Sequence, residues 1–194
     1  AAGPVVLSSL ADWPHDYRLV TTEAAARELA ATLEAAPTFA FDTETTGMDA
    51  RTVDLVGMSF ATEPGRAWYV AVPPHGGGSA EASSNDLFVH AAQTAARPAA
   101  REAARRFVQI FARAFADPAK TLVAQNAKYD VAVLSRYGVV FGSTVRDTML
   151  EHYVTDAASR HGLDVLAREF LGYDPVPITR LIGGKERGRA QKSM

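Results

Sequence analysis

The fold and the chemistry both start from residues 39–44, which read Phe-Ala-Phe-Asp-Thr-Glu. Three apolar residues run into two acids, a pattern that predicts a buried strand with a polar end. Because alternate side chains of a strand share a face, Asp42 and Glu44 point to the same side. Two carboxylates at one strand end suit a hard divalent cation. The bare triplet also fits a solvated turn, but two like charges at the end of a buried strand are costly unless a cation or hydrogen bonds compensate.

A second polar group follows a short strand expected at residues 121–124. Residues 125–130 read Gln-Asn-Ala-Lys-Tyr-Asp, where that strand passes into a helix. Asp130 lies at the margin of the apolar face of this helix. Two plainer interpretations stay open: Asp130 as a first-turn acid favoured by the helix dipole, and Asn126 as an ordinary N-cap.

The remaining pattern predicts an α/β domain with a mixed sheet. Apolar runs at residues 17–20, 55–61 and 67–72 are typical of strands, and the turn between the last two predicts an antiparallel hairpin. Helical patterns cover residues 21–36, 99–116, 127–137, 145–154 and 163–171. We expect residues 1–16 to form an irregular lead-in and residues 73–85 a loop.

The composition excludes several classes of protein. The chain has 194 residues, 47% of them hydrophobic, a formal net charge of -2 and no cysteine. A cysteine nucleophile and thiolate zinc sites are therefore excluded, and a broad basic face for duplex nucleic acid is disfavoured. No apolar run approaches the roughly 18 to 20 residues of a membrane span, and no signal pattern opens the sequence. We expect a cytoplasmic protein with no membrane partner.

Together the motifs resemble the 3'-5' proofreading exonuclease domain of bacterial family A DNA polymerases, within the ribonuclease H-like group whose active sites carry four acids. The resemblance covers residues 17–182. It is carried by segments in the family order, namely residues 39–45, 55–61, 125–130, 147–150, 160–164 and 181–183. It implies a three-layer α/β fold with a mixed central sheet flanked by helices.

The resemblance also implies a two-metal phosphodiesterase. Asp42 would bridge two divalent cations, Mg2+ or Mn2+, Glu44 would bind one and orient the attacking water, and Asp130 would hold the second through its water shell. The implied substrate is the 3' end of single-stranded DNA, the product a nucleoside monophosphate, and the partner a polymerase domain of the same parent chain. Cations would then neutralise the scissile phosphate, which agrees with a mildly acidic domain.

Five residues match positions at which the family contacts its substrate. Met48 stands where an apolar side chain wedges between the last bases, and Thr43 where a backbone group meets the 3' end. Gln125 and Asn126 match polar contacts to the terminal nucleotides, and Tyr129 a position near the bound strand. Stacking on such surfaces accepts any base. Met48 and Tyr129 also fit ordinary packing residues.

One acid of the family pattern is missing. It belongs to a Tyr-x-x-x-Asp motif that follows the Leu-Ile-Gly segment, whereas the last aspartate here is Asp174. His152 and Asp156 have a similar spacing but come too early, so we interpret them as surface helix residues. Residues 183–194 look like a flexible basic tail that precedes the missing helix, and the sequence resembles a fragment of a longer chain.

Two alternative functions remain. The first is a 3'-5' exoribonuclease of the same superfamily, which a comparison of DNA with RNA substrates would separate. The second is a non-catalytic domain that keeps the fold as a spacer. Retention of Asp42, Glu44 and Asp130 together weighs against the spacer.

We predict that a protein of residues 1–194 alone is nearly inactive, while its parent is active. The physical reason is that one metal ligand, and the tyrosine that helps to position the attacking water, are missing. The measurement is a nuclease assay on labelled single-stranded DNA with Mg2+ or Mn2+. Full turnover by the 194-residue chain would contradict the prediction.

Overall fold

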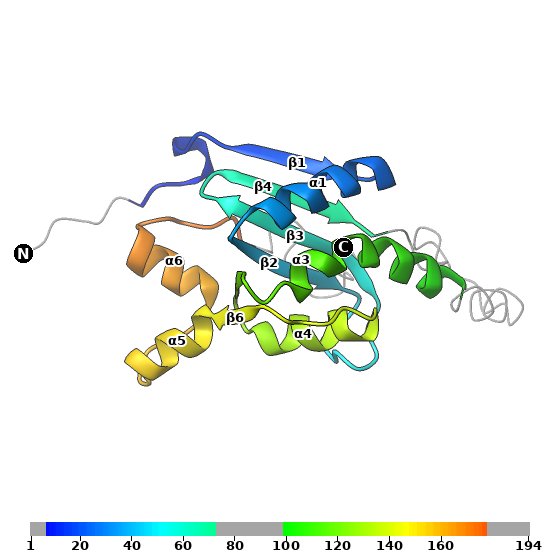
Figure 1. Cartoon of the computed structure of the whole chain (residues 1–194). Coiled ribbons are helices and arrows are strands. Elements are labelled where there is room, and N and C mark those ends of the chain that lie inside the picture. Colours follow the sequence, from blue (N-terminus) through cyan, green and yellow to red (C-terminus); the bar gives the residue numbers. More distant parts are fainter. Residues whose placement is uncertain (1–6, 73–98, 178–194) are drawn as a thin grey trace, which may run out of the picture.

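The computed structural model describes residues 7–72 and 99–177, which form a mixed β-sheet with helices packed beside it (Figure 1). The described strands follow the order β1-β4-β3-β2-β5-β6. They are β1 (Asp16–Val20), β2 (Thr38–Thr45), β3 (Leu55–Glu63), β4 (Arg66–Ala71), β5 (Thr121–Ala124) and β6 (Thr144–Asp147). The pairs β2/β3 and β3/β4 are antiparallel, whereas β1/β4, β2/β5 and β5/β6 are parallel. The predicted α/β class, the mixed sheet and the hairpin are confirmed.

Helices begin and end close to the expected residues. They are η1 (Leu10–Asp12), α1 (Glu23–Ala35), η2 (Gln109–Phe111), α3 (Ala112–Ala116), α4 (Ala127–Arg136), α5 (Thr148–Thr155) and α6 (Leu163–Leu171), and residues 99–108 are helical and lead into η2. Thr22 caps α1 by accepting a hydrogen bond from Ala25 N. Gly172 ends α6 with a left-handed φ of 59°.

The expected helix over residues 145–154 is wrong in its first turn. Residues 144–147 form β6 instead, and α5 begins only at Thr148. The edge of β5 offers backbone hydrogen bonds to this segment in parallel register, with Leu122 opposite Val145, and such tertiary pairing overrides a local helical pattern. The expected loop at residues 73–85, the Leu-Ile-Gly segment at 181–183 and the expected tail at 183–194 lie outside the described residues.

Aromatic rings fill the space between one face of the sheet and the helices. Phe39 and Phe41 of β2 each meet Phe115 of α3 edge to face, with ring centroids 5.7 and 5.3 Å apart. Phe60 of β3 stacks on Phe111 of η2 at 5.2 Å. Because side chains alternate along β2, the residues between these phenylalanines point to the opposite face of the sheet.

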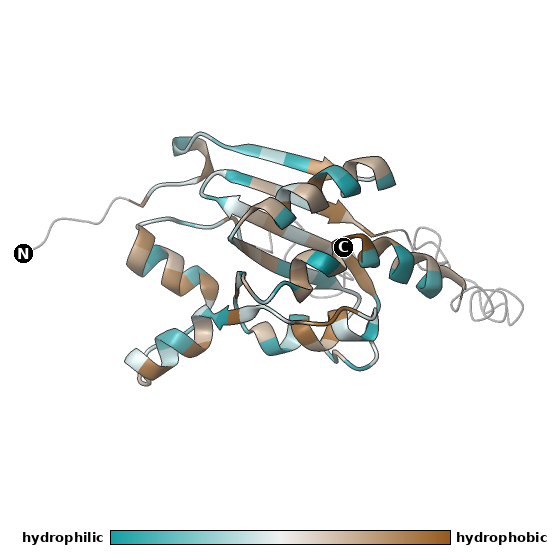
Figure 2. Ribbon diagram, viewed as in Figure 1, coloured by the Kyte–Doolittle hydropathy of each residue, from teal (hydrophilic) through white to brown (hydrophobic). Residues whose placement is uncertain are grey.

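The edge strand β1 differs from this core, because Figure 2 shows hydrophilic residues over much of its length.

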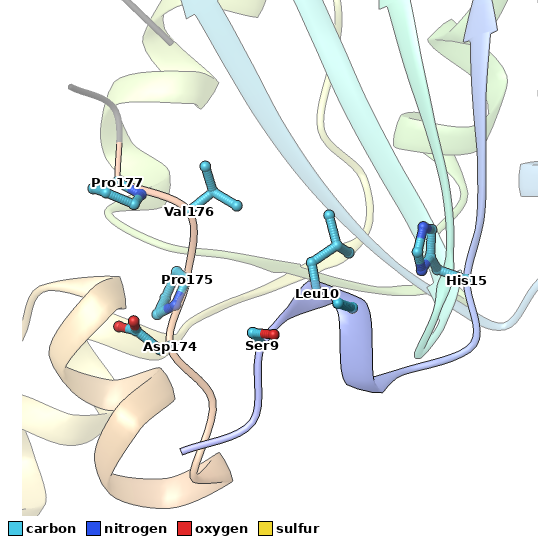
Figure 3. A pocket seen from close by; sticks show the side chains of 8 residues that line it. Ser9, Leu10, His15, Asp174, Pro175, Val176 and Pro177 are labelled. Atoms are coloured by element: carbon cyan, nitrogen blue, oxygen red, sulfur yellow. The ribbon is translucent and has the colours of Figure 1, made fainter. Parts of the chain in front are cut away.

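The segment before β1 lies beside the segment after α6. Ser8 N donates to Gly172 O and Asp174 N donates to Ser8 O, both at 2.8 Å. A groove of about 540 Å³ between the two segments is lined by Ser9, Leu10, Ala11, His15 and residues 174–177 (Figure 3). The acids of β2 do not line it. Of the helices in the described ranges, none is long and apolar enough to cross a bilayer.

Candidate active site

The acids of residues 39–44 lie at the carboxyl end of β2. Asp42 pairs with Ser59 of β3 and Glu44 with Gly57, and the register shifts directly after Glu44. Asp42 and Glu44 therefore share one face of the sheet, while Thr43 points to the other. Asp42 is exposed, Glu44 is half-buried and Thr43 is buried. The strand thus presents two carboxylates on one side of its end.

Asp130 binds the same strand end from the first turn of α4. It is only 2% exposed. Its Oδ1 accepts hydrogen bonds from Thr43 N at 3.0 Å and from Thr43 Oγ1 at 2.5 Å. A buried carboxylate needs such donors to offset the loss of water. These bonds fix α4 against β2 and bring a third acid next to Asp42 and Glu44.

The three carboxyl groups disfavour one another's charge. The loss of water around its carboxyl group, and secondly the charge of Glu44, raises the pKa of Asp42 to about 6, although the residue as a whole is exposed. Burial also raises the pKa of Asp130 to about 6, with a contribution from Asp42, although the hydrogen bonds from Thr43 act in the opposite direction. Burial and then the charge of Asp130 raise the pKa of Glu44. Negative charge is thus concentrated at this strand end.

This donor set fits a hard divalent cation. All three groups are carboxylates, which Mg2+ and Mn2+ favour, and a bound cation would relieve their mutual repulsion. Within residues 7–72 and 99–177, no group of three or more acidic or histidine side chains is close enough together to hold a metal ion as the side chains stand. The acids instead form an open edge, with Asp130 turned to Thr43.

Asn126 combines two costly features in the turn between β5 and α4. Its φ of 58° makes it the one described residue other than glycine with a positive φ. Its Oδ1 is buried and has no hydrogen-bond partner among the described residues. Strain and an unpaired buried acceptor both point to a functional position. The plain N-cap interpretation is wrong for the side chain, because Asn126 occupies the cap position of α4 without making a side-chain capping bond.

Gln125 is held by the protein itself. Its Nε2 donates to His161 O at 2.6 Å, and its Oε1 accepts a hydrogen bond from Thr148 Oγ1. Both amide atoms of Gln125 are therefore engaged, and they tie β5 to the start of α5 and to the segment before α6.

Met48 and Tyr129 meet at the turn after β2. Tyr129 OH donates to Gly47 O at 2.8 Å and lies 2.6 Å from Thr45 Oγ1. This contact lets α4 hold the turn on which Met48 stands 94% exposed. Met48 is therefore not a packing residue, whereas Tyr129 packs in part against the core.

Sequence reasoning did not single out Asp147 as a site residue. Its carboxylate is 9% exposed and accepts four backbone hydrogen bonds. Oδ1 accepts from Asn126 N and Met149 N at 3.0 Å and from Leu150 N at 3.3 Å, and Oδ2 accepts from Ala127 N at 2.8 Å. One side chain thus caps α5 and the start of α4. An aspartate directly before a helix is a cap signal, but the helical pattern expected from residue 145 placed Asp147 inside the helix, whereas α5 begins at Thr148.

His152 is not a surface residue, so that interpretation is wrong. It is 8% exposed. Its Nδ1 lies 2.7 Å from His161 Nδ1, and its ring meets Phe170 of α6 edge to face at 5.5 Å. The inner side of α5 faces α6, and the side chain is buried there. Asp156 is exposed, as expected.

A mixed sheet with acids at the end of an inner strand is the architecture of ribonuclease H-like exonucleases, and comparisons with known proteins agree. The sequence pattern of a family described as 3'-5' exonuclease matches residues 17–181. The chain is 34% identical over 171 residues to DNA polymerase I of Pseudomonas aeruginosa, which covers 87% of this chain and 17% of that protein.

Solved structures show the same fold. The catalytic core of RRP6 from Trypanosoma brucei superimposes with a TM-score of 0.61 at 15% identity, covering 97% of this chain and 43% of that one. Escherichia coli RNase D, an exoribonuclease involved in structured RNA processing, gives a TM-score of 0.53 at 14% identity, covering 81% of this chain and 34% of that one. The expected ribonuclease H-like fold is confirmed.

The chain belongs to the 3'-5' exonuclease domain family of family A DNA polymerases. The resemblance inferred from its motifs is thereby confirmed. The chain spans 17% of the length of the polymerase from Pseudomonas aeruginosa and 14% of that from Rhizobium leguminosarum.

We predict that Asp42→Asn stabilises the metal-free protein at about pH 7.5 by about 1 kcal/mol. The folded state holds the Asp42 proton with a pKa of about 6, against an ordinary 3.8. Wild-type stability therefore falls as the pH rises through this interval, whereas asparagine stays neutral. The roughly 3 kcal/mol of a two-unit shift is reduced because the side chain is exposed to solvent.

The measurement is a set of melting curves in EDTA at about pH 4 and about pH 7.5. Most of the gain from Asp42→Asn should disappear at the lower pH, where the folded wild type is almost fully protonated and the unfolded wild type, with an ordinary pKa of 3.8, is partly protonated. An equal gain at both pH values would show that charge is not its cause.

We predict that Asp147→Ala lowers the free energy of unfolding by about 3 kcal/mol, because four N–H groups at two helix starts lose their acceptor. Asp147→Asn should cost less, since its amide oxygen can still accept. Urea denaturation measures both, with the exposed Asp156→Ala as the control. A loss equal to that of the control would rule out the double cap.

Proposed function

We propose that this chain is the proofreading exonuclease domain of a DNA polymerase I-like parent, removing nucleoside monophosphates from the 3' end of single-stranded DNA. The observation that carries this proposal is that Asp42, Glu44 and Asp130 lie together at the end of β2. Each of these acids has a raised pKa, so keeping all three charged in one place costs free energy. A reaction that requires bound cations explains why the acids are nevertheless together.

In this proposal the acids hold two divalent cations, Mg2+ or Mn2+. Asp42 would be the ligand that both cations share, and its charge interacts with those of Glu44 and Asp130. Glu44 would hold one cation and orient the attacking water, and Asp130 would hold the other through water, because its Oδ1 already accepts two hydrogen bonds from Thr43. When bound at these acids, such cations would supply activation of the water and stabilisation of the departing 3' oxygen.

Other residues of the chain bind and orient the 3' end. Met48 is exposed and free to wedge between the last bases. Asn126 contacts the terminal nucleotide, a role supported by its positive φ and by a buried Oδ1 that lacks a partner among the described residues. Thr43 supplies a backbone contact, Gln125 supports the turn at Asn126, and Tyr129 holds the turn of Met48 beside the bound strand. None of these contacts depends on the identity of the base.

A polymerase domain in the parent chain is the partner that this function requires, because a proofreader must receive the 3' end that the polymerase extends. A cytoplasmic location follows from the same assignment. The supporting observation is that the curated relatives are DNA polymerases I of which this chain matches one segment.

A second candidate is a 3'-5' exoribonuclease. It is favoured by the fold shared with RNase D, which is an exoribonuclease. DNA and RNA oligonucleotides of identical sequence separate the two candidates, because an RNA enzyme needs groups that recognise the 2'-hydroxyl. Faster removal of ribonucleotides would favour the second candidate.

We predict that Asp42→Ala in the parent protein lowers exonuclease turnover by about 1,000-fold or more, because several kcal/mol of transition-state stabilisation depend on the cations. Polymerase activity should not change. The assay follows the shortening of labelled single-stranded DNA. The matched control is Asp16→Ala, which removes an exposed acid from the edge strand β1.

Unchanged exonuclease turnover in Asp42→Ala would favour the non-catalytic spacer. Loss of both exonuclease and polymerase activity would show that the substitution damages the whole protein instead of this site.

A further inference from the structure

Tyr69 of β4 leans across β3 on the face that carries Asp42 and Glu44. It lies opposite Ser59, but its ring turns diagonally toward Gly57. A Cβ atom added to Gly57 would stand 2.1 Å from Tyr69 OH and 2.4 Å from Tyr69 Cζ. No side chain larger than glycine fits under this ring. Gly57 therefore provides the space that the phenol occupies.

Gly57 is also the residue of β3 that pairs with Glu44. A phenol that lies over Gly57 consequently points across the sheet at the strand position of Glu44. The charge of Glu44 acts on the phenol: burial, and secondly Glu44, raises the pKa of Tyr69. At neutral pH the hydroxyl keeps its proton and is a hydrogen-bond donor facing a carboxylate.

We propose that Tyr69 is a positioning residue for Glu44. Its phenol O–H donates to the Glu44 carboxylate, directly or through one water molecule, and so fixes the direction in which Glu44 faces its cation and the attacking water. Among the described residues, no direct hydrogen bond joins the Tyr69 hydroxyl to the Glu44 carboxylate. One water molecule can bridge the two groups in this arrangement. The role rests on the function proposed above for Glu44.

This role explains features that packing does not. Tyr69 is 36% exposed, so its hydroxyl is not needed to fill the core. The ring is accommodated by a glycine within an inner strand, where glycine weakens the strand and marks a close approach. Residues that orient a metal ligand typically change activity or metal affinity by about 10- to 100-fold when they are altered.

The test is Tyr69→Phe, which keeps the ring and removes only the hydroxyl. We expect an approximately 10- to 100-fold loss of exonuclease turnover in the parent protein and a weaker affinity of the 194-residue chain for Mn2+, measured by isothermal titration calorimetry. The melting temperature without metal should not change. Tyr17→Phe is the matched control, because Tyr17 is an exposed tyrosine on β1, at the far edge of the sheet.

A second variant moves the hydroxyl without removing it. Gly57→Ala forces the ring of Tyr69 out of its place, so it should reproduce the loss of Mn2+ affinity, and adding Tyr69→Phe to it should cost little more. The metal-free melting temperature shows whether Gly57→Ala still folds. If it does not, Tyr69→Phe alone decides.

The outcomes separate this inference from the proposed function. If the wild type is active and Tyr69→Phe has the same exonuclease turnover and the same Mn2+ affinity, the role of Tyr69 is overturned. The proposed function then remains intact. If the wild-type parent protein neither degrades single-stranded DNA nor binds Mn2+ at this domain, both the role of Tyr69 and the proposed function are overturned. A loss of affinity accompanied by an equal loss in Tyr17→Phe would show a general effect and also reject the role.

Discussion

Two hydrogen bonds from Thr43 to Asp130 join β2 to α4 across 87 residues of sequence, and the arrangement of the site depends on them. They supply donors to a carboxylate that is almost fully buried and that would otherwise be costly to keep. They also hold its charge near Glu44, where it adds to the effect of burial in raising the pKa of that carboxyl group. The contact that stabilises the fold therefore concentrates the negative charge that a cation would offset.

A second carboxylate organises the other side of α4. Asp147 accepts hydrogen bonds from the backbone at the starts of α4 and α5, and this leaves Asn126 in a left-handed conformation with an unpaired oxygen. The energy gained by two capped helices offsets the strain in the turn between them. The buried Oδ1 of Asn126 thus stays without a hydrogen-bond partner among the described residues.

Local patterns predicted much of the fold, because they depend on neighbours in sequence. Apolar runs placed β2, β3 and β4, and caps and periodicity placed α1, α4 and α6. The failures have a common cause, since β6 exists only through its pairing with β5 and His152 is buried only because α6 packs on α5. The role of Asp147 was missed for the same reason, as two of its four donors come from a turn about twenty residues earlier.

The sequence by itself determined the family of the protein and the acids that are candidates for its chemistry. The acids at 42, 44 and 130, with the segments around them, are enough to identify the exonuclease family and the strand and helix on which each acid stands. Only the tertiary structure decided that Thr43 holds Asp130 and that Tyr69 reaches across Gly57 toward Glu44. These contacts depend on the register of β2, β3 and β4 and on the packing of α4 against β2, which are properties of distant segments and are absent from any local pattern.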